Sequence, residues 1–185
     1  MTEGLLDIMN DIVNIRDYHD HPIPENVLNE LYTAFRMGPT SISTQAGELL
    51  VIEDKHKRQK MVEATLNPYL TKDSYGAQSW ILDAPFVCVV LIEKRRALAR
   101  VGEKGLSIAV QEVNASIQNV RLLARSHGLS TACVREFDPE KLRENLELPW
   151  YIMPIAILTA GYSDVKVEAP PRLPIDDIVS KEEWR

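Results

Sequence analysis

The sequence contains few cysteines and lacks the spacings that join cysteines or bind a metal ion. Its two cysteines, Cys88 and Cys133, lie far apart within apolar runs and form no Cys-x-x-Cys pair. We therefore predict two buried thiols, with neither a disulfide nor a zinc site, and a reducing compartment. The four histidines form no His-x-x-His pattern, so the sequence predicts no metal site.

An excess of positive charge and long apolar runs are also missing. The chain carries 21 basic and 27 acidic residues, a net charge of −6, and a pI near 5.3. That balance argues against binding to nucleic acid or to an anionic membrane surface, because both require a cationic face. The apolar runs are far shorter than the roughly 18–20 residues of a membrane span, and the N-terminal residues lack a positive cluster. We therefore predict a cytoplasmic protein without nucleic-acid or membrane partners.

The sequence also lacks a domain linker and the motifs of two common enzyme classes. No glycine- or serine-rich linker divides the 185 residues, and a hydrophobic content of 45% is enough for one substantial core, so a single domain is predicted. Ser41 and Ser43 are not in a Gly-x-Ser-x-Gly setting, which disfavours hydrolase chemistry. The two glycines within residues 102–105 lack the strand-turn-helix context of a Rossmann phosphate site.

Helical and strand patterns alternate along the chain. Apolar spacing and end signals predict helices near residues 24–37, 55–66, 106–127 and 139–148, and strands near 48–53, 86–92, 131–134 and 153–159. This alternation predicts an α/β or α+β sandwich. The tail after Tyr162, rich in proline and charge, is expected to lie on another surface, such as that of a partner subunit.

Residues 15–45 are the most informative stretch. Arg16 precedes a helix that leads into residues 38–45, Gly-Pro-Thr-Ser-Ile-Ser-Thr-Gln, which we call the hydroxyl turn. A cation followed by small hydroxyl donors suits a phosphorylated cofactor with many hydrogen-bonding groups, and Arg172 offers a second cation. This pattern favours a flavin nucleotide.

Several short motifs occur in a characteristic order. They are Ile-Val-Asn-Ile-Arg-Asp-Tyr at 12–18, Pro-Ile-Pro at 22–24, Pro-Thr-Ser-Ile-Ser-Thr-Gln-Ala-Gly at 39–47, Asp-Ala-Pro at 83–85, Gly-Leu-Ser-Thr-Ala-Cys at 128–133 with Phe-Asp at 137–138, Gly-Tyr at 161–162 and Arg-Leu-Pro at 172–174. In this order and spacing, which cover nearly the whole chain, the sequence resembles the FMN-dependent nitroreductase family.

The resemblance implies a fold and an activity. The fold would be an α+β three-layer sandwich with a central mixed, mainly antiparallel sheet flanked by helices, in an intertwined homodimer. Residues 1–185 would form one FMN-binding domain, with residues 165–185 as a C-terminal arm on the partner subunit. FMN would take hydride from NAD(P)H and pass it to a small-molecule acceptor such as a nitroaromatic or a quinone. No catalytic side chain is then expected, because N5 of FMN carries the chemistry.

The resemblance also implies which residues bind FMN. Arg16 and Arg172 would contact the phosphate or the ribityl chain, and Asn14 would replace a serine that binds the pyrimidine end of the ring. The remaining expected contacts lie along the ring and ribityl chain, where the backbone of Arg135 would give N5 a donor: Pro39, Thr40, Ser41, Ser43, Cys133, Val134, Arg135 and Glu136.

The sequence departs from the family pattern at several of these positions. Ile12 and Val13 replace basic residues, Ser43 replaces an asparagine, and residues 46–47 are Ala-Gly instead of Pro-Trp. Two alternatives therefore remain open: a flavin-binding protein of this fold without turnover, or a flavin enzyme of this fold with other chemistry, such as dehalogenation or flavin fragmentation.

Overall fold

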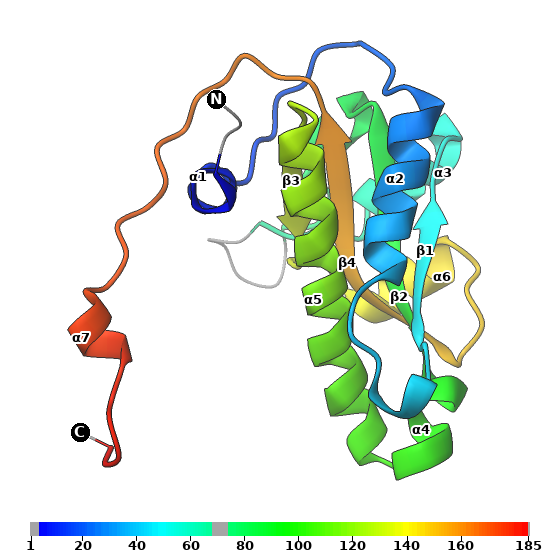
Figure 1. Cartoon of the computed structure of the whole chain (residues 1–185). Helices are drawn as coiled ribbons and strands as arrows, with labels where there is room; N and C mark the ends of the chain where they lie inside the picture. The colour runs from blue at the N-terminus through cyan, green and yellow to red at the C-terminus, as the bar shows by residue number, and fades with distance from the viewer. Residues whose placement is uncertain (1–3, 68–73, 185) are drawn as a thin grey trace.

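A four-stranded sheet forms the centre of the molecule. The computed structural model describes residues 4–67 and 74–184. The strands are β1 (Gly47–Val51), β2 (Phe86–Glu93), β3 (Ser130–Val134) and β4 (Ile152–Gly161), in the order β1-β2-β4-β3 (Figure 1). Each of the three ladders is antiparallel, and one isolated parallel bridge joins Asn14 to Thr131 at the β3 edge.

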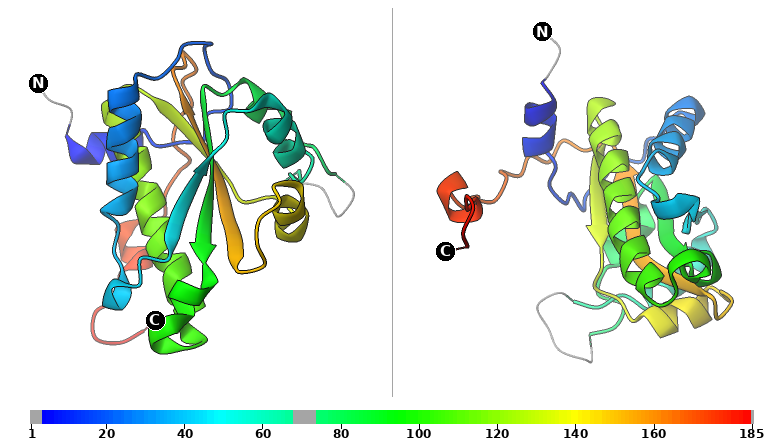
Figure 2. Two further views of the ribbon diagram at one scale, coloured as in Figure 1. Left: turned by 90° about the vertical axis from the view of Figure 1, so that its right-hand side faces the viewer. Right: turned by 60° about the horizontal axis from the view of Figure 1, so that its bottom comes forward.

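Helices cover both faces of this sheet. Helices α2 (Glu25–Arg36) and α5 (Lys104–Ser126) lie on one face, and α3 (Lys55–Val62) and α6 (Pro139–Asn145) lie on the other with the 3-10 helix η2 (Ser79–Asp83) (Figure 2). Strand β2 is buried throughout because its alternate side chains enter two separate cores. The expected three-layer α+β sandwich with a mainly antiparallel sheet is confirmed.

The long helix α5 is the element that organises the rest. Its buried residues recur at helical spacing and pack toward the sheet and α2. The helix ends at Ser126 with His127 as its C-cap, and Gly128 follows with a positive φ of 73°, a conformation that glycine adopts without steric cost. The predicted helix at 106–127 is thus confirmed, beginning two residues earlier.

Helix α3 and the helix that follows β2 differ from the sequence prediction. Helix α3 ends at Val62 rather than at residue 66, and Thr65 instead makes a bridge with Phe137 and donates its hydroxyl to the Val62 carbonyl at 2.6 Å. Helix α4 (Lys94–Val101) was not predicted. Its first turn is capped by the buried Glu93, whose carboxylate accepts from the amides of Arg95 and Arg96, so a charged sequence begins a helix.

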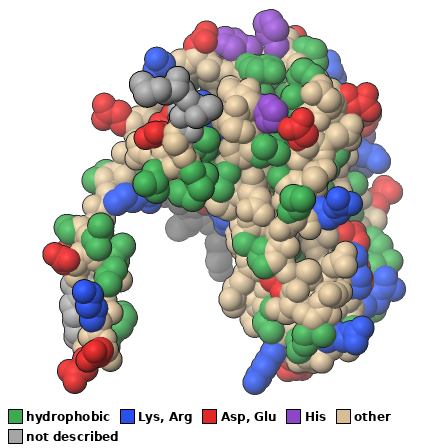
Figure 3. Space-filling model, in the orientation of Figure 1, with side chains coloured by type: hydrophobic (Ala, Val, Ile, Leu, Met, Phe, Trp, Pro, Cys, Tyr) green, Lys and Arg blue, Asp and Glu red, His purple; other side chains and the backbone are tan. Residues whose placement is uncertain are grey.

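The C-terminal arm leaves the body of the molecule. After Tyr162 the chain runs past helix α1 (Leu5–Asn10) to the short helix α7 (Ile175–Ile178), and Figures 1 and 3 show it standing away from the sheet and helices. Its apolar side chains are exposed in the single chain: Val165, Val167, Leu173, Ile175, Ile178, Val179 and Trp184. Arg185 lies outside the described residues. None of the described helices combines the length and apolarity needed to cross a bilayer.

Asp138 caps α6 and makes a pH-dependent contribution to the stability of the folded chain. Its Oδ1 accepts from the amides of Glu140 and Lys141 at 3.0 Å, and Tyr75 donates to its Oδ2 at 2.9 Å. The Lys141 amide, followed by the Tyr75 hydroxyl, lowers the pKa of Asp138. A lowered folded-state pKa means that the stabilisation is present at neutral pH and is lost as pH falls through that pKa.

We therefore expect Asp138→Ala to lower the free energy of unfolding by about 1 kcal/mol at pH 7. The difference from the wild type should shrink as pH falls below about 4, because the carboxyl group is then protonated in the unfolded chain while the folded chain still holds it ionised. Urea unfolding at several pH values measures this. Asp138→Asn keeps an oxygen acceptor and should show a smaller loss, whereas a pH-independent loss in the alanine variant would contradict the assignment.

Candidate flavin site

The structure brings the opening motif to strand β3. Asn14 pairs with Thr131, and its Oδ1 accepts from the Cys133 amide at 3.1 Å, a contact between residues 119 positions apart. Arg121 of α5 reaches the same place, where it donates to Asn14 Oδ1 at 3.1 Å and to Thr131 Oγ1 at 3.1 Å. We call Asn14, Arg121, Cys133, Arg135 and Glu136 the β3 half-site.

The end of β3 carries the predicted N5 donor. Arg135 and Glu136 are exposed, whereas Cys133 and Val134 are buried. The backbone amide of Arg135 donates to Oε2 of the neighbouring Glu136 at 3.2 Å. The Arg135 guanidinium donates to Oδ1 of Asn114 on α5 at 2.7 Å. The guanidinium is therefore held by α5, and Glu136 takes the backbone donor that N5 was expected to use.

Arg16 lies next to this half-site but contacts no carboxylate within the described ranges. It is exposed, while its neighbour Ile15 is buried and donates its amide to Thr131. Tyr18 anchors the segment: its hydroxyl donates to the Ile15 carbonyl at 2.6 Å and is hydrogen-bonded to Thr159 at 2.7 Å. Burial raises the pKa of Tyr18 to about 12, so the hydroxyl stays protonated and the segment stays attached.

The hydroxyl turn forms a second region beside α5. Its central residues form the 3-10 helix η1 (Ser41–Ser43). Within the turn, Thr40 Oγ1 accepts from the Gln45 amide at 2.9 Å. The Ser41 amide donates to the carboxylate of Glu112 on α5. Pro39 and Thr40 line a cavity of about 450 Å³ between α2, β1, α4 and α5. Donors expected to serve a flavin thus already have partners in the free chain.

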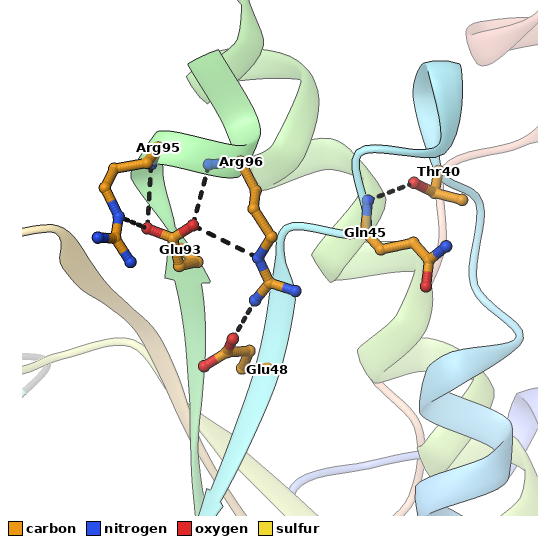
Figure 4. A network of polar contacts seen from close by, with 6 residues as sticks. All are labelled: Thr40, Gln45, Glu48, Glu93, Arg95 and Arg96. Carbon is orange, nitrogen blue, oxygen red and sulfur yellow. Dashed lines mark hydrogen bonds and ion pairs between the residues drawn. The ribbon is translucent and has the colours of Figure 1, made fainter. Parts of the chain in front are cut away.

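An ion-pair network closes one side of this cavity. Glu93 binds Arg95 at 2.7 Å and Arg96 at 3.4 Å, and Arg96 continues to Glu48 on β1 (Figure 4). Figure 4 shows this network between α4 and β1, with the Thr40–Gln45 contact at its side. The network attaches α4 to the sheet next to the hydroxyl turn, so Arg95 and Arg96 are structural contacts here.

The hydroxyl turn is also strained. Ile42, Ser43 and Gln45 have positive φ values of 52°, 53° and 45°, in a region that residues other than glycine rarely occupy. For the β-branched Ile42 the cost is about 1–2 kcal/mol. Strained backbone concentrates at functional sites, so this cluster supports a functional role for the turn.

We expect Ile42→Asn to raise the free energy of unfolding by about 1 kcal/mol, because asparagine tolerates the left-handed region. Ile42 is 59% exposed, so little burial is lost. Thermal and urea unfolding measure the change. Ile42→Val keeps the β-branch and serves as the control; equal stability of the Asn and Val variants would refute the strain argument.

The β3 half-site and the hydroxyl turn lie on opposite sides of α5. Glu112 and Arg121 are nine residues apart, which places them about 180° apart around the helix and about 14 Å apart along it. Helix α5 therefore separates the two regions within one chain. Two copies of the chain could each present one of these regions to the same ligand.

Arg172 is not assembled with either region. It is an exposed residue of the arm that begins after Tyr162 and stands away from the core (Figure 1). Within one chain the structure therefore unites Asn14, Cys133, Val134, Arg135 and Glu136, and separately Pro39, Thr40, Ser41 and Ser43, with Arg16 next to the first group. The part of the chain that is described contains no group of three or more His, Cys, Asp or Glu residues suited to a metal ion.

Four residues of α5 were missed by sequence reasoning. Asn114, Arg121 and Arg125 share one face of the helix within about 40°, and they bind Arg135, Asn14 and Asp11 respectively. Their polar spacing was visible in the sequence, but such a stripe ordinarily marks a solvated surface. Glu112 was missed for the same reason.

Comparison with known proteins identifies the class. The model of the Nitroreductase family matches residues 14–162, so the chain belongs to the Nitroreductase family. An FMN reductase [NAD(P)H] of Bacillus subtilis is 27% identical over 190 residues, covering 95% of this chain and 72% of the relative. A Cr(VI) reductase of Pseudomonas sp. is 26% identical, with 92% of this chain and 71% of the relative covered.

Solved structures agree on the fold. Nitroreductase A of Vibrio parahaemolyticus superimposes with a TM-score of 0.85 at 20% identity, covering 98% of this chain and 76% of that one. The NADPH:FMN oxidoreductase of Vibrio harveyi, solved with NAD+, gives a TM-score of 0.84 at 19% identity. The match covers 98% of this chain and 78% of that one. The expected family and fold are confirmed.

Proposed function

We propose that this protein is an NAD(P)H-dependent flavin oxidoreductase that binds FMN between two copies of the chain. At the level of the general class this agrees with the family and with the names of the relatives, an FMN reductase and a Cr(VI) reductase. The observation that carries the proposal for this chain is the β3 half-site, where the opening motif and the end of β3 meet. Bound FMN supplies two-electron transfer at N5 from NAD(P)H to an oxidised acceptor, for which we propose a nitroaromatic or a quinone.

The residues present fit this cofactor. FMN is rich in hydrogen-bond acceptors and carries an anionic phosphate, and the β3 half-site offers the guanidinium groups of Arg121 and Arg135 with Arg16 nearby. The side chains of Cys133 and Val134 are buried in the two cores, so these residues would face the ring with their backbone. The hydroxyl turn has Glu112 beside it, which repels a phosphate, so it suits the uncharged ring and ribityl chain.

The same arrangement supports a dimer. The half-site and the hydroxyl turn face away from each other across α5, and the arm exposes apolar side chains that the single chain does not bury. We propose a homodimer in which the arm of one copy, including Arg172, packs on the other. The arm would then bring the second cation to the phosphate.

Glu136 would have to release the Arg135 amide when FMN binds. Its carboxylate is exposed, so it can turn to solvent and free the donor for N5. The backbone of Arg135 would then hold one face of the ring, while its guanidinium stays fixed to Asn114. The chain thus positions the cofactor without a side chain that transfers protons.

The test is the absorption spectrum of the purified protein, before and after incubation with FMN. We expect the spectrum of a bound flavin and its bleaching by NADH or NADPH without oxygen. A bound flavin that neither nucleotide bleaches would favour the binding protein without turnover. Failure to bind FMN would exclude the enzyme, and products other than a reduced acceptor would favour different flavin chemistry.

A further inference from the structure

Arg121 is a partly buried cation of the β3 half-site whose hydrogen bonds within the described ranges all go to neutral protein groups. Its Nε donates to Thr131 Oγ1 at 3.1 Å, and its Nη2 donates to the Val13 carbonyl at 3.3 Å and to Asn14 Oδ1 at 3.1 Å. Each partner is neutral, and Arg121 has no ion-pair partner in residues 4–67 and 74–184. Its positive charge is therefore not cancelled locally.

These contacts decide which way the Asn14 amide points. Asn14 Oδ1 accepts from both the Cys133 amide and Arg121, and neither group can accept a hydrogen bond. The oxygen must face them, so the Nδ2 group faces away. Asn14 consequently offers only donors to a ligand, and it selects a carbonyl or another acceptor in preference to an N–H group.

Arg121 brings a positive charge to the opening motif, which has no basic side chain of its own before Arg16. Positions 12 and 13 are Ile and Val, so this segment brings no basic side chain before Arg16. Arg121 contacts the backbone of that same segment from α5, and Arg125, one turn later, binds Asp11 at 2.5 Å. Helix α5 thus supplies a guanidinium from a distant part of the sequence.

We propose that Arg121 is a positioning residue of the flavin site: it fixes the Asn14 amide as a donor toward the C2 carbonyl edge of FMN and places a positive charge behind it. This inference rests on the proposed function. Negative charge increases at the N1–C2 edge when a flavin takes up electrons, so a nearby cation favours the reduced cofactor. The role concerns both affinity and midpoint potential.

The test compares FMN affinity, by fluorescence titration, with the midpoint potential of bound FMN. Arg121→Met keeps the apolar stem, and we expect it to bind FMN at least tenfold more weakly. We also expect it to lose about tenfold in preference for reduced over oxidised cofactor, which is about −30 mV for a two-electron couple. Arg121→Lys keeps the charge without the planar fork, so it should recover the potential but only part of the affinity.

Two further variants separate positioning from general stability. Asn14→Asp keeps an oxygen for Cys133 and Arg121 but removes the donor, so it should fold and bind FMN at least tenfold more weakly. Arg125→Met removes the neighbouring cation that binds Asp11 and should leave the potential unchanged. Wild-type affinity and potential in both Arg121 variants would overturn the inference while leaving the proposed function intact, whereas a wild-type protein that binds no FMN would overturn the proposed function itself.

Discussion

A mixed dimer of two defective chains is expected to bind FMN when neither parent does. One chain carries Arg16→Glu, which should disable its β3 half-site, and the other chain carries Ser41→Trp, which should block its hydroxyl turn. If each flavin contacts the β3 half-site of one copy and the turn of the other, each homodimer has two damaged sites. The mixed dimer places both changes in one site and leaves the other intact, so it should bind one FMN.

Both substitutions are at exposed positions, which makes folded variants the expected result. The two chains carry different affinity tags, mixed dimers are isolated by sequential purification, and FMN is quantified by absorbance. Lys57→Glu, on α3 at the opposite face of the sheet, is the charge-reversal control and should bind FMN as the wild type does. A mixed dimer without FMN, or an Arg16→Glu homodimer with full occupancy, would contradict a shared site.

The layered core could be predicted because its signals are local. The β-branched run at residues 86–92 is buried on both sides, and the apolar stripe of residues 106–127 packs on the sheet, as strand and helix periodicity require. Helix α4 could not be predicted, because its first turn depends on the buried Glu93 carboxylate and on Arg96 reaching Glu48 across the sheet. Those contacts are tertiary, and residues 94–96 by themselves resemble a solvated surface.

The candidate site likewise contains some residues that the sequence pointed to and others that it did not. The resemblance pointed to Asn14 and Cys133, and the structure joins them by a hydrogen bond, although no local rule links residues that far apart. Arg121 escaped notice because a single arginine on a long helix is usually solvated. Only the parallel bridge between Asn14 and Thr131 brings the opening segment under that side chain.

Arg58 is another charged residue whose role the sequence concealed. A charged residue in a helix ordinarily lies on the solvated face, but the Arg58 side chain turns toward the loops around β2. Its Nε donates to the Ile52 carbonyl at 2.8 Å and its Nη1 to the Ala84 carbonyl at 2.6 Å, with a longer contact to Pro85 at 3.4 Å. Burial lowers the pKa of Arg58. One guanidinium thus joins α3, the end of β1 and the start of β2.

We expect Arg58→Met to lower the free energy of unfolding by about 3 kcal/mol, because partly buried carbonyls lose charged donors worth about 1.5–3 kcal/mol each. Arg58→Lys should recover part of this, since one ammonium group cannot reach all of the acceptors. Urea unfolding at a fixed protein concentration measures the difference, with Lys57→Met as the control. These contacts lie on the sheet face opposite α5, so folded Arg58→Met should bind FMN normally; a loss below about 0.5 kcal/mol would show that water replaces the guanidinium.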